Sequence, residues 1–258
     1  NSLIIASMTT IGSTIVGTFF AWLVTRTDLP YKTFMKSLFL VPFMLPSFIG
    51  ALAWKMLLSP HSGYINKWFM ATFNTTEPLF DIYTYYGISC VEVMYLFPFV
   101  FIQVCGALER MDPTLEEAAR VSGASPLRTV LDVTLPLMAP SILAGGLLVF
   151  IAAGSCFGIP SIVGMPGNIE VMTTRIVTYI YMGDDAGIRD STALAASLMF
   201  IANILLMGMT WMMGRKDYTT ISGKSTRPNI VELGKWRWPA FCAVGLYGAI
   251  AVIIPLGS

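Results

Sequence analysis

Charge is what this 258-residue sequence lacks most: only 12% of its residues are Asp, Glu, Lys or Arg. Soluble domains carry about 25% charged residues, and a chain with half that share would expose apolar surface that drives association. The 16 basic and 15 acidic residues also nearly cancel, so there is no basic excess to attract nucleic acid. The composition therefore argues against both a soluble globule and a nucleic-acid-binding protein.

Residues that bind metals or form disulfides are also scarce. The sequence has one histidine, and its four cysteines are scattered over positions 90, 105, 156 and 242. These spacings fit neither a zinc site nor a disulfide framework, and we expect the thiols of Cys90, Cys105 and Cys156 to pack as small buried apolar groups. The phosphate-binding GxxxxGKS/T motif and the nucleophile elbow are missing too. We predict that the chain binds no metal or cofactor, is not an enzyme and does not hydrolyse ATP by itself.

Long apolar runs are what the sequence does contain. A helix needs about 20 mainly apolar residues to cross the ~30 Å of hydrocarbon in a bilayer. Five stretches meet this requirement and a sixth begins near Pro239; the five are residues 3–25, 37–58, 87–108, 137–158 and 193–213. The runs do not alternate as barrel strands do, and backbone polar groups find no partner in lipid. The predicted fold class is all-α: a polytopic membrane protein with a five-span core and the start of a sixth span.

Basic residues predict the orientation of these spans. Most of the lysines and arginines follow the first, third and fifth runs, and such residues concentrate on the cytoplasmic side of a membrane. The N-terminus should therefore face outside, and the loop 109–136 should be cytoplasmic. Because the chain starts at Asn1 and stops inside an apolar run, we expect a piece of a longer protein.

Several features inside the runs leave alternatives open. Pro42 and Pro46 predict a kink in the second run. Glu92 is a candidate for the translocation path, because ionisable groups at membrane depth are often functional, or it faces interfacial water near the outer end of its span. Asn203 either lines the path or, more commonly for such residues, bonds to a neighbouring helix.

The polar loop 109–136 contains signals for two short helices. Asp112 before Pro113 is a good start for the first helix, although a capping box at Thr114 competes with it. Gly123 stands where a left-handed residue should end this helix, and a second helix restarts at Ser125-Pro126. The loop should form a compact knob at the membrane surface.

Two faces of the first helix in this loop differ in character. Its small and apolar residues lie together; they are Leu115, Ala118, Ala119 and Ser122. On the opposite face, Glu116 and Arg120 have the spacing of an (i, i+4) ion pair. From composition alone, an ordinary cytoplasmic loop and a docking knob for a protein that moves the spans both remain open.

The same loop carries a pattern of seven positions that resembles the signature loop of bacterial binding-protein-dependent ABC importer permeases. These positions are Glu117, Ala118, Ala119, Gly123, Val133, Leu135 and Pro136, with Val133 where isoleucine is more usual. The resemblance implies an inner-membrane permease whose loop forms coupling helices on a cytoplasmic ATPase dimer. It further implies that ATP and Mg²⁺ bind to that ATPase, that an extracytoplasmic binding protein delivers the substrate, and that a second permease half completes the pore.

Five shorter stretches resemble ferric iron permeases; they are residues 22–30, 51–54, 62–66, 157–160 and 173–176. Such permeases often fuse two halves in one chain. The resemblance then implies a permease core at 1–214, a basic cytoplasmic linker at 215–238, and the first span of a second repeat at 239–258. Permeases for thiamine, polyamines and phosphonates share parts of these motifs and remain alternatives. An ion-coupled secondary transporter is less favoured, because only Glu92 could serve a coupling ion.

Two outer loops carry apolar stripes at helical spacing. One stripe consists of Ile65, Trp68, Phe69 and Phe73, and the other of Ile169, Met172, Ile176 and Tyr179. These segments either receive the binding protein or pack against the spans.

Overall fold

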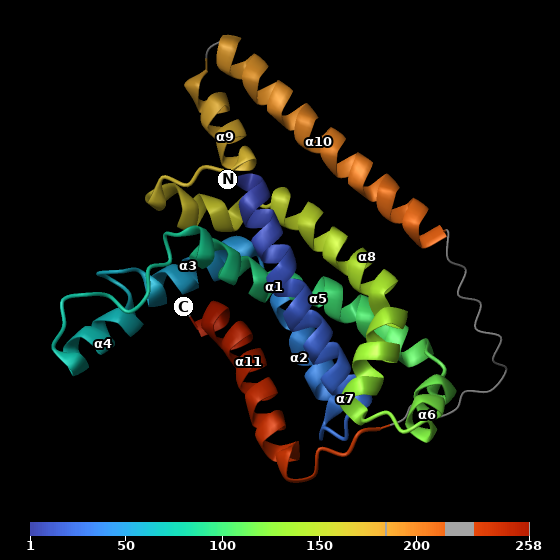
Figure 1. Cartoon of the computed structure of the whole chain (residues 1–258). Helices are drawn as coiled ribbons and strands as arrows, with labels where there is room; N and C mark the ends of the chain where they lie inside the picture. The colour runs from blue at the N-terminus through green and yellow to red at the C-terminus, as the bar shows by residue number, and fades with distance from the viewer. Residues whose placement is uncertain (184, 215–229, 258) are drawn as a thin grey trace.

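A computed structural model describes residues 1–183, 185–214 and 230–257, and most of these residues are helical (Figure 1). The first helices are α1 (Ser2–Arg26), α2 (Lys32–Met44), α3 (Ser47–Leu58), α4 (Tyr64–Phe73), α5 (Tyr85–Arg110) and α6 (Pro113–Val121). They are followed by α7 (Pro126–Thr129), α8 (Leu135–Gly154), α9 (Met172–Met182), α10 (Asp185–Gly214) and α11 (Arg237–Gly257). No β-strand occurs in the described ranges, apart from one isolated bridge between Thr27 and Val231. The predicted all-α class is confirmed.

Four helical runs among the described residues are long and apolar enough to cross a membrane: α1, α5, the run Leu127–Gly154 and α10. The pair α2 and α3 makes a fifth if it is counted as one bent span. These runs match the five predicted spans in order, although the fourth ends at Gly154 rather than at residue 158. Most of the linker predicted at 215–238 lies outside the described residues.

The second predicted span is broken rather than merely kinked. Helices α2 and α3 meet at 95° across Leu45 and Pro46. Pro46 has no N–H to continue the helix, and it forces Leu45 into an extended conformation with φ −86° and ψ 141°. Pro42 remains inside α2, and its carbonyl accepts a bond from the Leu45 N–H at 3.2 Å. The two prolines therefore produce one sharp break, at the second of them.

The centre of the molecule is a three-helix pack of α1, α5 and α8, in which α5 is the most buried of the candidate spans (Figure 1). Gly17 on α1 and Gly145 on α8 both face Val100 of α5: a Cβ added at Gly17 would lie 2.9 Å from the Phe97 carbonyl oxygen, and one added at Gly145 would lie 2.8 Å from the Val100 Cα. Small residues allow such close backbone approach between membrane helices.

Helix α11 packs against α2 and α3 and completes an aromatic cluster. The Tyr247 ring lies 4.8 Å from Phe20 and 5.5 Å from Phe97 between centroids, and Val244 is buried. The helix predicted from Pro239 is thus present from Arg237, and it shares the core of the preceding helices. Its assignment to a second repeat stays a prediction.

Helix α10 lies at the edge of the molecule, where it contacts α8 and α9 (Figure 1). None of the residues in its most apolar window is buried. Asn203 is exposed on this helix, and its side-chain amide donates to the Met199 carbonyl of the same helix at 2.8 Å. The expected bond from Asn203 to a neighbouring helix is therefore not formed in the described structure.

The two predicted apolar stripes fall at helices α4 and α9, although Ile169 of the second stripe lies before α9, which begins at Met172. In α4, Trp68 and Phe73 are exposed, while Asn66 is buried and holds the helix in place. The Asn66 amide donates to the carbonyls of Ser59 and Phe80 at 3.0 and 2.7 Å and accepts the Phe80 N–H at 2.9 Å. This anchor leaves the aromatic face of α4 free for lipid or for a partner.

Candidate functional site

The loop between α5 and α8 begins with a well-formed helix start. The Asp112 carboxylate accepts the Thr114 backbone N–H at 2.9 Å, and Pro113 occupies the first turn. Hydrogen bonding from Thr114 holds the pKa of Asp112 below its ordinary value. Helix α6 therefore starts at Pro113, and the competing start at Thr114 is not used.

Removing this cap should loosen the first turn of α6. We expect Asp112→Ala to speed hydrogen exchange of the α6 amides about fivefold, because the Thr114 N–H loses its acceptor. Asp112→Asn keeps an acceptor and should exchange nearly as the parent does. Because folding lowers the pKa of Asp112, the stabilisation from its carboxylate is fully present above the unfolded pKa. That stabilisation is lost as the pH falls through the folded pKa. Equal exchange in the alanine and asparagine variants, measured by mass spectrometry, would contradict the cap.

The chain reverses direction at Gly123, as predicted from its position. Its φ of +88° lies in the left-handed region, its N–H donates to the Arg120 carbonyl at 2.9 Å, and the next N–H, of Ala124, donates to Ala119 at 3.0 Å. These two bonds close the C-terminus of α6. The elbow is thus set by glycine's freedom at positive φ.

The second helix of the loop, which was expected to restart at Ser125-Pro126, is not a separate unit. Helix α7 continues through a π-helical turn, Val130–Thr134, directly into α8. Leu135 and Pro136 fall in the first turn of α8, and Val133 lies in the π-turn. Residues 126–154 are therefore one continuous helical run.

The signature residues fall into an outer and an inner group. Glu117, Ala118 and Gly123 are exposed and Ala119 is half-buried, whereas Val133 and Leu135 are half-buried at the junction with α8 and Pro136 is exposed there. The same loop also exposes four large apolar side chains; they are Leu115, Val121, Leu127 and Leu131. Exposed apolar surface beside small residues is typical of a docking site.

Glu116 does not point outward as the predicted ion pair with Arg120 requires. It is buried, where its Oε1 accepts the Thr134 hydroxyl at 2.8 Å and lies 3.6 Å from a guanidinium nitrogen of Arg26 at the end of α1. The sequence held no signal for this arrangement, because the partners of Glu116 lie on distant segments. The face opposite the exposed residues is thus an internal contact surface.

The segment after residue 229 closes over the same end of α1. The Val231 N–H donates to the Arg26 carbonyl at 2.7 Å, and the Asp28 N–H donates to the Val231 carbonyl at 3.2 Å. Asp28 in turn accepts the Leu233 N–H at 2.8 Å. The segment Ile230–Leu233 therefore fastens the chain before α11 to the base of α1.

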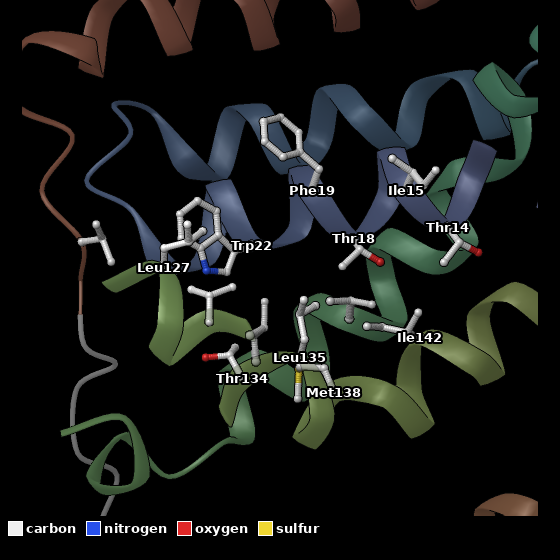
Figure 2. Close-up of a pocket in the computed structure, with 14 residues that line it drawn as sticks. Thr14, Ile15, Thr18, Phe19, Trp22, Leu127, Thr134, Leu135, Met138 and Ile142 are labelled. Carbon is white, nitrogen blue, oxygen red and sulfur yellow. The ribbon is translucent and has the colours of Figure 1, made fainter. Parts of the chain in front are cut away.

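An apolar groove of about 620 Å³ runs from this region along α1, α5 and α8. Figure 2 shows Thr18 and Trp22 of α1 opposite Leu135 and Met138 of α8. The residues that line the groove carry no charge, and its polar side chains are the threonines 14, 18 and 134 and the indole of Trp22. Such a lining does not hold a charged ligand.

Glu92, which like Asn203 is a candidate for the translocation path, is fully buried and does not face interfacial water. Its Oε2 accepts the Thr9 hydroxyl at 2.8 Å, and the Cys156 thiol lies beside it. A role for Glu92 or Asn203 in the path stays a prediction. Among the described residues, no three His, Cys, Asp or Glu side chains gather as metal ligands.

Comparison with known proteins gives a family for the chain. The sequence profile of the family described as "Binding-protein-dependent transport system inner membrane component" matches residues 13–216. A putative ferric transport system permease protein, FbpB 1 of Haemophilus influenzae, is 29% identical over 90% of this chain and 36% of its own length. The sulfate permease CysT of Salmonella typhimurium is 30% identical over 79% of this chain and 73% of its own length.

Other relatives and a solved structure agree with this match. The spermidine/putrescine permease PotB of Escherichia coli is 29% identical over 71% of this chain and 66% of its own length. The chain spans about a third of the length of the ferric permeases that it matches. A solved bacterial alginate ABC transporter has the same fold, with a TM-score of 0.61 and 18% identity over 87% of this chain and 78% of that one. The chain therefore belongs to the inner-membrane components of binding-protein-dependent transport systems, a family of multi-pass ABC importer permeases.

Proposed function

We propose that this chain is a permease half of an ATP-driven importer and that the exposed surface of α6 is its docking site for a cytoplasmic ATPase dimer. The observation that carries the proposal is the exposure of Glu117 and Ala118 on the capped helix α6, and of Gly123 at the elbow that joins α6 to the continuous helix α7–α8. ATP and Mg²⁺ would bind to the ATPase, whose closure would displace α6 and shift α5 and α8 against the second half. This gives alternating access without chemistry on the chain itself.

Site-directed crosslinking tests this docking and the orientation together. In a background without the four native cysteines, Ala118→Cys should crosslink to the ATPase subunit when the complete transporter is assembled in membranes. The matched control is Thr76→Cys, because Thr76 is also exposed but lies in the loop after α4, which we propose faces outside together with the N-terminus. A crosslink from Thr76 in place of Ala118, or none from Ala118 in a complex that hydrolyses ATP, would refute the proposal.

We further propose ferric iron as the cargo, handed over by an extracytoplasmic binding protein. The support is the extent of the match: the ferric relatives align with 90% of this chain, against 79% for the sulfate permease and 71% for the polyamine permease. The ferric relatives are also long enough for two halves, which supports a fused second half. Thiamine, polyamine and phosphonate remain the alternatives from sequence, and sulfate joins them.

Uptake into proteoliposomes separates these cargoes. We expect ferric iron to accumulate only with its loaded binding protein outside and ATP inside, while sulfate and spermidine presented by their own binding proteins do not. Uptake that follows an ion gradient and continues without ATP would instead favour a secondary transporter. Accumulation of sulfate or spermidine but not iron would reassign the cargo within the same family.

A further inference from the structure

Arg26 is one of the most deeply buried large side chains in the described structure, with 1% of its surface exposed. It is the last residue of α1, and its single ion-pair partner among the described residues is Glu116 of α6, at 3.6 Å. A guanidinium carries five N–H donors, and none of its three nitrogens has a hydrogen-bond acceptor in the described part of the chain. The charge of Arg26 is thus balanced by one carboxylate on the coupling loop.

The space around this pair is too small for a substrate. The chamber beside Arg26 and Glu116 has a volume of about 10 Å³, and Arg120, Trp22, Thr129 and Val231 are among its other lining residues. That is roughly the room that one water molecule needs. The pair is therefore a link between segments rather than a binding site.

The Arg26–Glu116 pair links α1 to α6, two helices that are not neighbours in the sequence. Helix α6 follows α5 after Met111 and reaches α8 through the elbow and α7, whereas α1 is remote in sequence. Glu116 joins α1 through Arg26 and joins the π-turn before α8 through the Thr134 hydroxyl. A single carboxylate thus ties α6 to the ends of two of the three central helices.

We propose that Arg26 and Glu116 are positioning residues for energy coupling: their pair makes α1 move with α6, so that all three central helices respond to the ATPase. The inference rests on the proposed docking of α6. Without the pair, α6 would still pull on α5 and α8, and the base of α1 would follow only through its packing against those two helices. Loss of the pair should uncouple hydrolysis from transport rather than prevent docking.

The test is the amount of substrate imported per ATP hydrolysed by the purified complete transporter in proteoliposomes. Glu116→Gln removes the charge but keeps an acceptor for Thr134, and Arg26→Met keeps the length of the side chain. In each variant we expect the import-to-ATP ratio to fall about tenfold, a typical size for coupling between sites. The crosslink from Ala118→Cys to the ATPase should persist.

The control and the double variant separate coupling from folding. Lys36→Gln breaks the partly exposed pair of Lys36 with Glu109, which joins α2 to α5 without touching α6, and should keep the parental ratio. Replacing Arg26 and Glu116 together by methionine leaves no uncompensated buried charge, so it should restore the yield of assembled complex but not the ratio. A parental ratio in Glu116→Gln, or in the double variant, would overturn the inference. If Ala118→Cys fails to crosslink to the ATPase when Arg26 and Glu116 are both intact, the proposed docking itself would be refuted.

Discussion

Replacing Gly17 with leucine should prevent the central helices from packing and abolish production of the folded protein. An added Cβ at this position would meet the Phe97 carbonyl oxygen at 2.9 Å, the Val100 Cβ at 2.9 Å and the Phe101 backbone nitrogen at 3.0 Å. Two of these three atoms belong to the backbone of α5 and cannot move aside as the end of a flexible side chain would. Overpacking typically lowers the free energy of unfolding by about 1–3 kcal/mol, and backbone contact places this substitution at or above the upper end.

A matched leucine elsewhere controls for the substitution itself. Gly208 lies within α10, where an added Cβ has no neighbour within 4 Å, so Gly208→Leu should leave the yield unchanged. Size-exclusion chromatography of fluorescently tagged protein in detergent measures the folded fraction, and Gly17→Ala should fall between the other two. Similar monodisperse peaks for Gly17→Leu and Gly208→Leu would show that α1 and α5 are not in backbone contact.

The spans could be predicted from sequence because each depends on a property of its own residues. Runs of apolar residues locate α1, α5, α8 and α10, and Pro46 marks the break between α2 and α3. The angle of that break could not be predicted, since it depends on what packs against the two short helices. The place of α11 beside α2 and α3 was also beyond the sequence, because apolar composition does not say which helices a span touches.

The same division holds within the loop between α5 and α8. The cap at Asp112 and the elbow at Gly123 were predictable because each is satisfied by backbone groups a few residues away. The burial of Glu116 was not, because helical spacing alone pairs it with Arg120, whereas tertiary structure brings Arg26 and Thr134 to it. Likewise, counting residues left open that Glu92 faces interfacial water, whereas the structure buries it beside Thr9 of the facing helix.

Replacing Gly123 with valine should leave a folded permease whose transport is strongly reduced. The position adopts φ +88°, and a left-handed conformation costs an L-residue about 1–2 kcal/mol, with β-branched side chains worst placed to accept it. No atom lies within 4 Å of an added Cβ, so the penalty falls on the backbone of the elbow rather than on packing. We expect α6 to reorient away from the ATPase, and both uptake and binding-protein-stimulated ATP hydrolysis to fall at least about tenfold, the scale of a typical coupling free energy.

Two companions isolate the backbone conformation as the cause. Asparagine tolerates left-handed φ far better than valine, so Gly123→Asn should keep most of the uptake although it also adds a side chain to the docking surface. Gly154 has equally open surroundings but no positive φ, so Gly154→Val should keep parental transport. If the Gly123→Val variant assembles with its partners and imports at the parental rate, the left-handed elbow does not set the angle at which α6 meets the proposed ATPase. The mechanical role would then have to lie in the continuous helix α7–α8 alone.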